Sequence, residues 1–116
     1  MKKLLWGSVA VAVLGFSANA FAGFGAIAYS PSTGRSGTSW SYSCESEAET
    51  AALQQCGGGD CQIQVWVQDA CAAFAVAPDS TGWAWSGSLQ AATNNAVGSC
   101  LNNGGQGCSV QAWLCT

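Results

Sequence analysis

Cysteine is the residue type that offers most chemistry in this chain, and seven cysteines are present. Cysteine thiolates bind zinc, act as nucleophiles or form disulfides. Zinc sites usually contain C-x-x-C pairs, but the tightest spacing here is Cys56-x4-Cys61. Histidine is absent, which excludes a Ser-His-Asp triad, a Cys-His dyad and a histidine-bound zinc. We therefore expect structural disulfides, with no metal and no catalytic thiol.

Carboxylates are the other candidates for catalysis. Glu45, Glu47 and Glu49 lie at the expected start of a helix, where acidic residues favour the helix dipole. Asp60 and Asp79 lie in segments typical of turns. No pair is marked as the acid and base of a glycosidase, and the net charge of −3 gives no basic surface for nucleic acid. We expect a protein that is not an enzyme, has no catalytic residues and needs no cofactor.

Aromatic residues are the third group that could carry function. Trp83 and Trp85 are two residues apart on an expected strand, so their side chains share a face, and the same is expected of Trp40 and Tyr42. Two alternatives stay open. These faces pack under helices as core, or they are exposed and stack on sugars or on a partner protein.

The first 22 residues are typical of an export signal. Lys2 and Lys3 precede an uncharged, mostly apolar stretch from 4 to 16, and Ala20 and Ala22 form an A-x-A site. We expect cleavage before Gly23, with cleavage after Ala20 as the alternative. The apolar stretch is too short to span a bilayer comfortably. The sequence predicts a periplasmic or secreted protein with no stable membrane anchor after cleavage.

The remaining chain, 23–116, reads as a single domain made of two similar halves, at about 23–70 and 71–116. In each half a tryptophan, Trp66 or Trp113, follows the second cysteine of a glycine-rich loop by five residues. Each half is expected to run strand, strand, helix, strand. Strands are expected at 24–29, 38–43, 62–68, 72–76, 82–86 and 109–114, and helices at about 46–56 and 89–100. The first helix is expected to begin at a capping box formed by Ser46 and Glu49 and to end at Cys56 before three glycines, and Ser88 is expected to cap the second helix.

This pattern predicts an α+β fold with about six mostly antiparallel strands and two helices on one face. The halves also suggest disulfide pairs, although sequence alone does not fix connectivity. Cys56 with Cys61 and Cys100 with Cys108 occupy the same place in each half and should pair alike. Cys71 and Cys115 each follow a Trp-bearing strand, and a bond between them would join the two halves. Cys44 has no counterpart in the second half and is expected to be the free thiol.

The chain also resembles a known family. The residues that carry the resemblance are 25–30, the Cys56-Gly-Gly-Gly-Asp-Cys61 loop with Val65-Trp66, the run 71–76, Gly82-Trp83-Ala84-Trp85 and the closing 108–115. They are similar to the small exported bacterial proteins grouped as domain of unknown function 4189. The resemblance implies a secreted or periplasmic, disulfide-containing domain, and it implies no activity. Cys44 departs from the family pattern.

These observations favour binding over catalysis. The leading hypothesis is an exported, non-enzymatic protein that binds another protein or a cell-envelope component, for example as an inhibitor or immunity-type protein. The alternative is a carbohydrate or cell-wall binding module that uses exposed tryptophans. A hydrolase that works with carboxylates alone is the remaining enzyme hypothesis.

Overall fold

The structure, a computed structural model, describes residues 23–116, and the expected export signal lies outside the described residues. The strands are β1 (Phe24–Tyr29), β2 (Ser36–Tyr42), β3 (Gln62–Gln68), β4 (Cys71–Ala77), β5 (Ser80–Ser86) and β6 (Ser109–Cys115), and the helices are α2 (Glu45–Cys56) and α3 (Leu89–Asn102). All strand pairs are antiparallel. The α+β class, with six strands and two helices, is confirmed.

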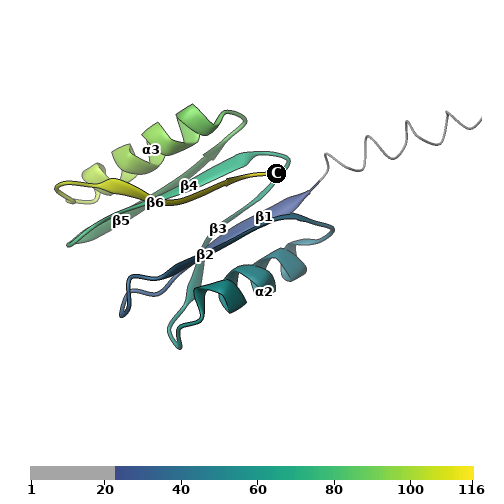
Figure 1. Ribbon diagram of the computed structural model, residues 1–116. Coiled ribbons are helices and arrows are strands. Elements are labelled where there is room, and N and C mark those ends of the chain that lie inside the picture. The colour runs from purple at the N-terminus through teal and green to yellow at the C-terminus, as the bar shows by residue number, and fades with distance from the viewer. Residues whose placement is uncertain (1–22) are drawn as a thin grey trace, which may run out of the picture.

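The strands form two three-stranded sheets, in the orders β2-β1-β3 and β5-β4-β6. The sheets stack face to face, as Figure 1 shows. The space between them is filled by one apolar cluster centred on Phe74 and Ile27, both fully buried. The ring of Tyr29 packs on that of Phe74, with 4.8 Å between ring centroids. This cluster, rather than a helix, covers the inner face of each sheet.

The helices cover the two outer faces, one on each sheet (Figure 1). In α2 the buried stripe Ala48, Ala52 and Cys56 packs on β1, and in α3 the stripe Ala92, Ala96 and Cys100 packs on β4. The expected placement of both helices on one face is therefore corrected. The physical reason is that β1 and β4 are central strands with apolar residues on both faces, so each needs a helix on one side and the other sheet on the opposite side.

Each helix lies unusually close to its sheet, because a glycine faces it. A Cβ atom added to Gly82 would lie 2.5 Å from the carbonyl oxygen of Ala96 and would also meet the nitrogen of Cys100. Gly37 faces Ala52 and Cys56 of α2 in the same way. Only glycine permits this close approach of strand and helix backbones.

The helix ends agree in part with the sequence prediction. Ser88 caps α3 by accepting a hydrogen bond from the backbone N–H of Ala91 at 3.2 Å, as expected. The predicted capping box at Ser46 is wrong, because the N-cap of α2 is Cys44, two residues earlier, and its side chain makes no capping hydrogen bond. The end of α2 at Cys56 is confirmed, and Gly57 follows it with a left-handed φ of 73°.

Three disulfides tie the elements together: Cys56–Cys61, Cys71–Cys115 and Cys100–Cys108. These are the pairs that the sequence suggests, and disulfides are typical of proteins in oxidising compartments. The order strand, strand, helix, strand occurs twice along the chain, although an origin by internal duplication stays a prediction. Between residues 23 and 116, no helix is both long enough and apolar enough to cross a membrane.

Candidate functional site

Asp60 is the carboxylate with the most developed hydrogen bonding. The hydroxyl of Ser30, which is fully buried, donates a hydrogen bond to Asp60 Oδ1, and the backbone N–H of Ser32 donates to Oδ2 at 3.0 Å. These bonds hold the pKa of the Asp60 carboxyl below its ordinary value, the Ser30 bond most strongly. Asp60 therefore fastens the β1–β2 turn to the loop after α2. Because the Ser30 hydroxyl is buried, it is not placed to attack a substrate.

The glutamates at the start of α2 form no catalytic pair. Burial raises the pKa of Glu49, and the neighbouring Glu45 carboxyl raises it further through a hydrogen bond and like charge. Both side chains belong to one helix and are half-buried beside it. Within the described part of the chain, no three His, Cys, Asp or Glu side chains cluster so that they could hold a metal ion.

Cys44 carries the free thiol of the described chain and is half-buried at the start of α2. Its Sγ atom lies 3.4 Å from the hydroxyl oxygen of Ser46. With no histidine in the sequence, no imidazole is available to activate this thiol. The structure thus brings together no nucleophile and general base among these residues.

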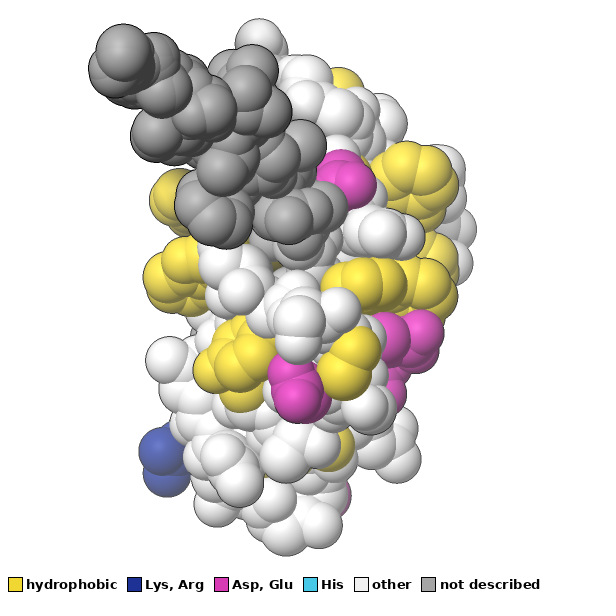
Figure 2. Space-filling view, turned by 90° about the vertical axis from the view of Figure 1, so that its right-hand side faces the viewer, with side chains coloured by type: hydrophobic (Ala, Val, Ile, Leu, Met, Phe, Trp, Pro, Cys, Tyr) yellow, Lys and Arg dark blue, Asp and Glu magenta, His cyan; other side chains and the backbone are white. Residues whose placement is uncertain are grey.

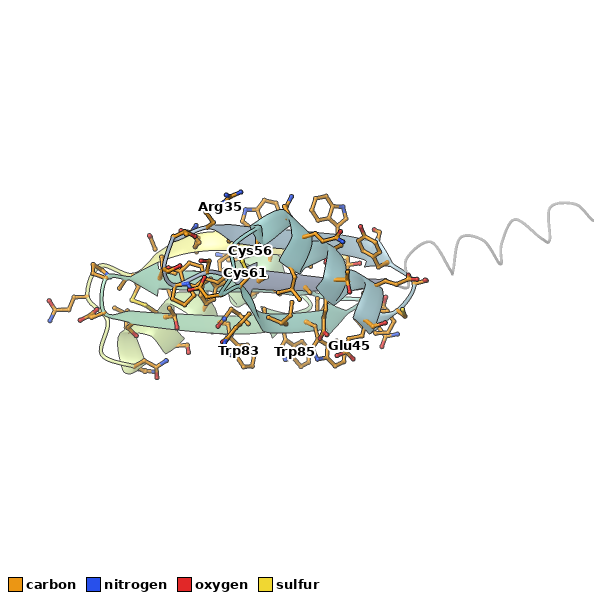
Figure 3. All side chains as sticks on the ribbon, turned by 90° about the horizontal axis from the view of Figure 1, so that it is seen from below. Arg35, Glu45, Cys56, Cys61, Trp83 and Trp85 are labelled. Carbon is orange, nitrogen blue, oxygen red and sulfur yellow. A yellow bond between two sulfur atoms is a disulfide. The ribbon has the colours of Figure 1, made fainter. Side chains whose placement is uncertain are left out.

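Trp83 and Trp85 project from β5 in the direction opposite to α3. Gly82 contacts α3 directly and Ala84 packs against the cluster beneath it, so strand alternation turns both tryptophans the other way. Their side chains are 48% and 60% exposed. Figure 3 shows both indoles extending along one edge of the molecule. The sequence left open whether these tryptophans are buried core or exposed, and the structure shows that Trp83 and Trp85 are exposed.

A groove runs beside these two tryptophans. It has a volume of about 560 Å³ and is lined by Trp83 and Trp85 on one side and by residues 64–68 of β3 on the other. Both β3 and β5 are edge strands, each in a different sheet. Val65 and Val67 are buried beside the groove, while Gln68 is exposed. We call this feature the β3–β5 groove.

The expectation that Trp40 and Tyr42 share a face is wrong. Phe24 pairs with Tyr42 but Ala26 pairs with Ser39, so β2 carries an extra residue, and Ser41 takes a left-handed φ of 65°. This bulge reverses the alternation and places Tyr42 in a shallow hollow beside α2. Trp40 is exposed on the opposite face of β2, since Ser39 faces α2 and donates a hydrogen bond to the Ala48 carbonyl.

Two further exposed tryptophans were not among the predicted site residues. Trp66 on β3 packs its ring 6.1 Å from that of Phe24 and remains 44% exposed, and Trp113 on β6 is 55% exposed. Figure 2 shows hydrophobic side chains in separate clusters on the surface. Trp66 and Trp113 each lie five residues after a disulfide cysteine, and this repeated spacing could have marked both as candidate site residues.

Fold and site together define a small disulfide-bonded α+β sandwich with an aromatic groove between two sheet edges. Over residues 24–115 the chain matches the domain of unknown function DUF4189, and it belongs to that family. The family's description assigns no activity.

One solved structure is similar to this chain, namely the NMR structure of Rv1813c from Mycobacterium tuberculosis. The two chains share 32% sequence identity with a TM-score of 0.60, over 81% of this chain and 75% of that one. No curated protein matches the chain.

Proposed function

We propose that this chain is an exported, non-enzymatic binding protein and that the β3–β5 groove receives a partner protein. Export is supported by the signal-like residues 1–22 and by three disulfides in a small domain. The groove carries the binding proposal because it combines three half-exposed tryptophans, Trp66, Trp83 and Trp85, with the free edges of two strands. Tryptophan is enriched among residues that dominate protein interfaces.

The groove favours an extended segment of the partner. Edge strands present unpaired backbone N–H and C=O groups that an added strand can use. Trp83 and Trp85 would hold apolar side chains of that segment, and the amides of Gln64 and Gln68 would hydrogen-bond its polar groups. No acidic or basic side chain lines this groove, so recognition would depend on shape and apolar contact rather than on charge.

Affinity capture with a matched control tests this function. The oxidised protein, a Trp83→Ala/Trp85→Ala variant and a Trp113→Ala variant are each immobilised and exposed to the periplasmic and secreted proteins of a bacterial host. We expect a protein that the parent and Trp113→Ala both retain and the double variant loses. Trp113 is a suitable control because it is 55% exposed, like the groove tryptophans, but does not line the groove. Recovery of no protein, or equal retention by all three, would contradict the proposal.

A second candidate is glycan or cell-wall binding, favoured by one observation. Two tryptophans on one face of a strand, beside the amides of Gln64 and Gln68, could stack on sugar rings and hydrogen-bond their hydroxyls. Titration of the protein with peptidoglycan fragments, followed by tryptophan fluorescence, distinguishes this candidate. Unchanged emission at millimolar glycan would exclude it.

A further inference from the structure

The backbone of Gly23 is held by Asp69 at two points. The Gly23 nitrogen donates a hydrogen bond to Asp69 Oδ1 at 2.8 Å, and the Gly23 carbonyl accepts one from the backbone N–H of Asp69 at 2.9 Å. The two residues are 46 positions apart in the sequence. Asp69 adopts a left-handed φ of 55°, a conformation that aspartate tolerates better than most residues do. The aspartate is thus set to receive the nitrogen of residue 23.

Both ends of the domain meet the connection between β3 and β4 at this point. The backbone N–H of Thr116 donates a hydrogen bond to the carbonyl of Ala70, the residue after Asp69, at 3.0 Å. The Thr116 hydroxyl in turn accepts one from the N–H of Ser41 at 3.0 Å. Gly23 is buried in this arrangement, and a Cβ atom there would lie 2.6 Å from Thr116 Oγ1. Residue 23 is therefore enclosed by the fold.

Among residues 23–116, the carboxylate of Asp69 has no basic side chain as a partner. Beyond Lys2 and Lys3, Arg35 is the only basic residue of the sequence, and it lies beside Gly57 in the loop after α2. A positive charge at Gly23 would supply that partner. Peptide-bond hydrolysis produces such a charge, because it converts a neutral amide nitrogen into an ammonium group.

We propose that the chain is processed immediately before Gly23 and that Asp69 binds the new N-terminal ammonium, so that processing creates an ion pair that ties β1 to the β3–β4 connection. In this step a signal peptidase adds one water across the bond between residues 22 and 23. Residue 22 leaves with a carboxylate, and Gly23 keeps a protonated amine. The 2.8 Å hydrogen bond from a neutral amide to the Asp69 carboxylate becomes one between an ammonium and a carboxylate, in which both partners are charged.

The alternative cut, after Ala20, gives a different result. The ammonium would then belong to Phe21, two residues before Gly23, and the nitrogen facing Asp69 would remain a neutral amide. The proposal rests on the export that we propose above, but not on the binding function of the groove.

The absence of lysine after residue 3 makes the test specific. The full chain is expressed with its own leader in a bacterial host, and the intact mass of the exported product is measured. The processed product should begin at Gly23, and its α-amine is then its only primary amine. Acetylation at neutral pH, followed by hydroxylamine to remove any thioester from the free thiol of Cys44, therefore reports on that one amine.

We expect the amine of the folded protein to be acetylated roughly tenfold more slowly than that of an Asp69→Asn variant, because the carboxylate keeps it protonated and bound. Acetylation of the unsubstituted protein should also lower its Tm, by about 4–8 °C for each 1 kcal/mol lost in a domain of this size. Acetylation of Asp69→Asn should leave its Tm unchanged. Asp79→Asn, in the β4–β5 turn, is the matched control and should behave like the parent protein.

Three outcomes would overturn the proposal. A product that begins at Phe21 places the cut elsewhere. A product that keeps residues 1–22 contradicts the proposed export as well. A product that begins at Gly23 but whose Tm does not change on acetylation shows that the ammonium is not bound by the fold. The change in Tm on acetylation is measured on the unsubstituted protein, so it tests whether the fold binds the ammonium even if Asp69→Asn does not fold.

Discussion

Replacement of Gly82 by alanine tests the contact that determines where Trp83 and Trp85 point. The added Cβ would lie 2.5 Å from the Ala96 carbonyl oxygen and would also meet the Cys100 nitrogen. Both neighbours are backbone atoms, so α3 must move away from β5. Moreover, Cys100 is bonded to Cys108, which limits that movement.

Overpacking of a well-packed interior costs about 1–3 kcal/mol, and contact with helix backbone argues for the upper part of that range. For a domain of this size, a loss of 2–3 kcal/mol corresponds to a fall in Tm of roughly 10–20 °C. The assay is thermal unfolding of the oxidised protein, followed by circular dichroism.

Gly87→Ala is the matched control, because no atom lies within 4 Å of a Cβ at that position and its φ is not left-handed. Its Tm should be unchanged or slightly raised, since alanine reduces the entropy of the unfolded chain. If Gly82→Ala melts within about 2 °C of the parent, a difference far below that expected for lost packing, the seating of α3 on β5 is refuted. The outward direction of the tryptophans would then lose its structural basis.

Three further predictions concern stability. Phe74→Ala, which empties the centre of the cluster between the sheets, should lower the free energy of unfolding by about 3–5 kcal/mol in urea titrations; a loss below 1 kcal/mol would contradict the stacked sheets. Replacing Cys71 and Cys115 together by serine should lower the free energy of unfolding by about 4 kcal/mol, because their bond closes a separation of 44 residues. An unchanged urea midpoint would contradict this stabilisation by the disulfide. Asp60→Asn should be less stable than the parent at pH 7. Because the folded-state pKa of Asp60 is lowered, the difference in stability should shrink as the pH falls below the unfolded-state pKa of about 3.9 and should be lost below the folded-state pKa. A difference in stability that does not change with pH in this acid range would exclude this role.

Periodicity and turn residues predict most of the local structure here. The alternation in 62–68 identifies β3, and Ser88 and the glycines after Cys56 mark helix ends that the structure confirms. The disulfide pairs follow from equivalent positions in the two halves. Apart from the Cys71–Cys115 bond, these features depend on residues close together in the chain.

The placement of the helices depends on contacts between distant segments, and the sequence prediction missed it. A signal was nonetheless present, because the uninterrupted apolar run Cys71–Val76 is typical of a strand buried on both faces. Such a strand requires a layer on each side, which is incompatible with two helices on one face of a single open sheet.

The site was only partly predictable for a related reason. Trp83 and Trp85 share a face because β5 is regular over its pairing with β4. Trp40 and Tyr42 do not, because the bulge at Ser41 reverses the alternation, and nothing in the local sequence marks that bulge. The β3 side of the groove depends on how two sheet edges meet, which is a tertiary property.

The affinity of the captured partner for defined variants tests the central claim most directly. With the partner purified, Kd is measured by calorimetry for the parent protein, for Trp83→Ala/Trp85→Ala and for Trp113→Ala, each first shown to be folded by its Tm. Loss of two interface tryptophans, at about 2 kcal/mol or more each, predicts a Kd weakened more than 100-fold for the double variant, against a change within about threefold for the control. Equal affinities for all three proteins would contradict a binding role for the β3–β5 groove.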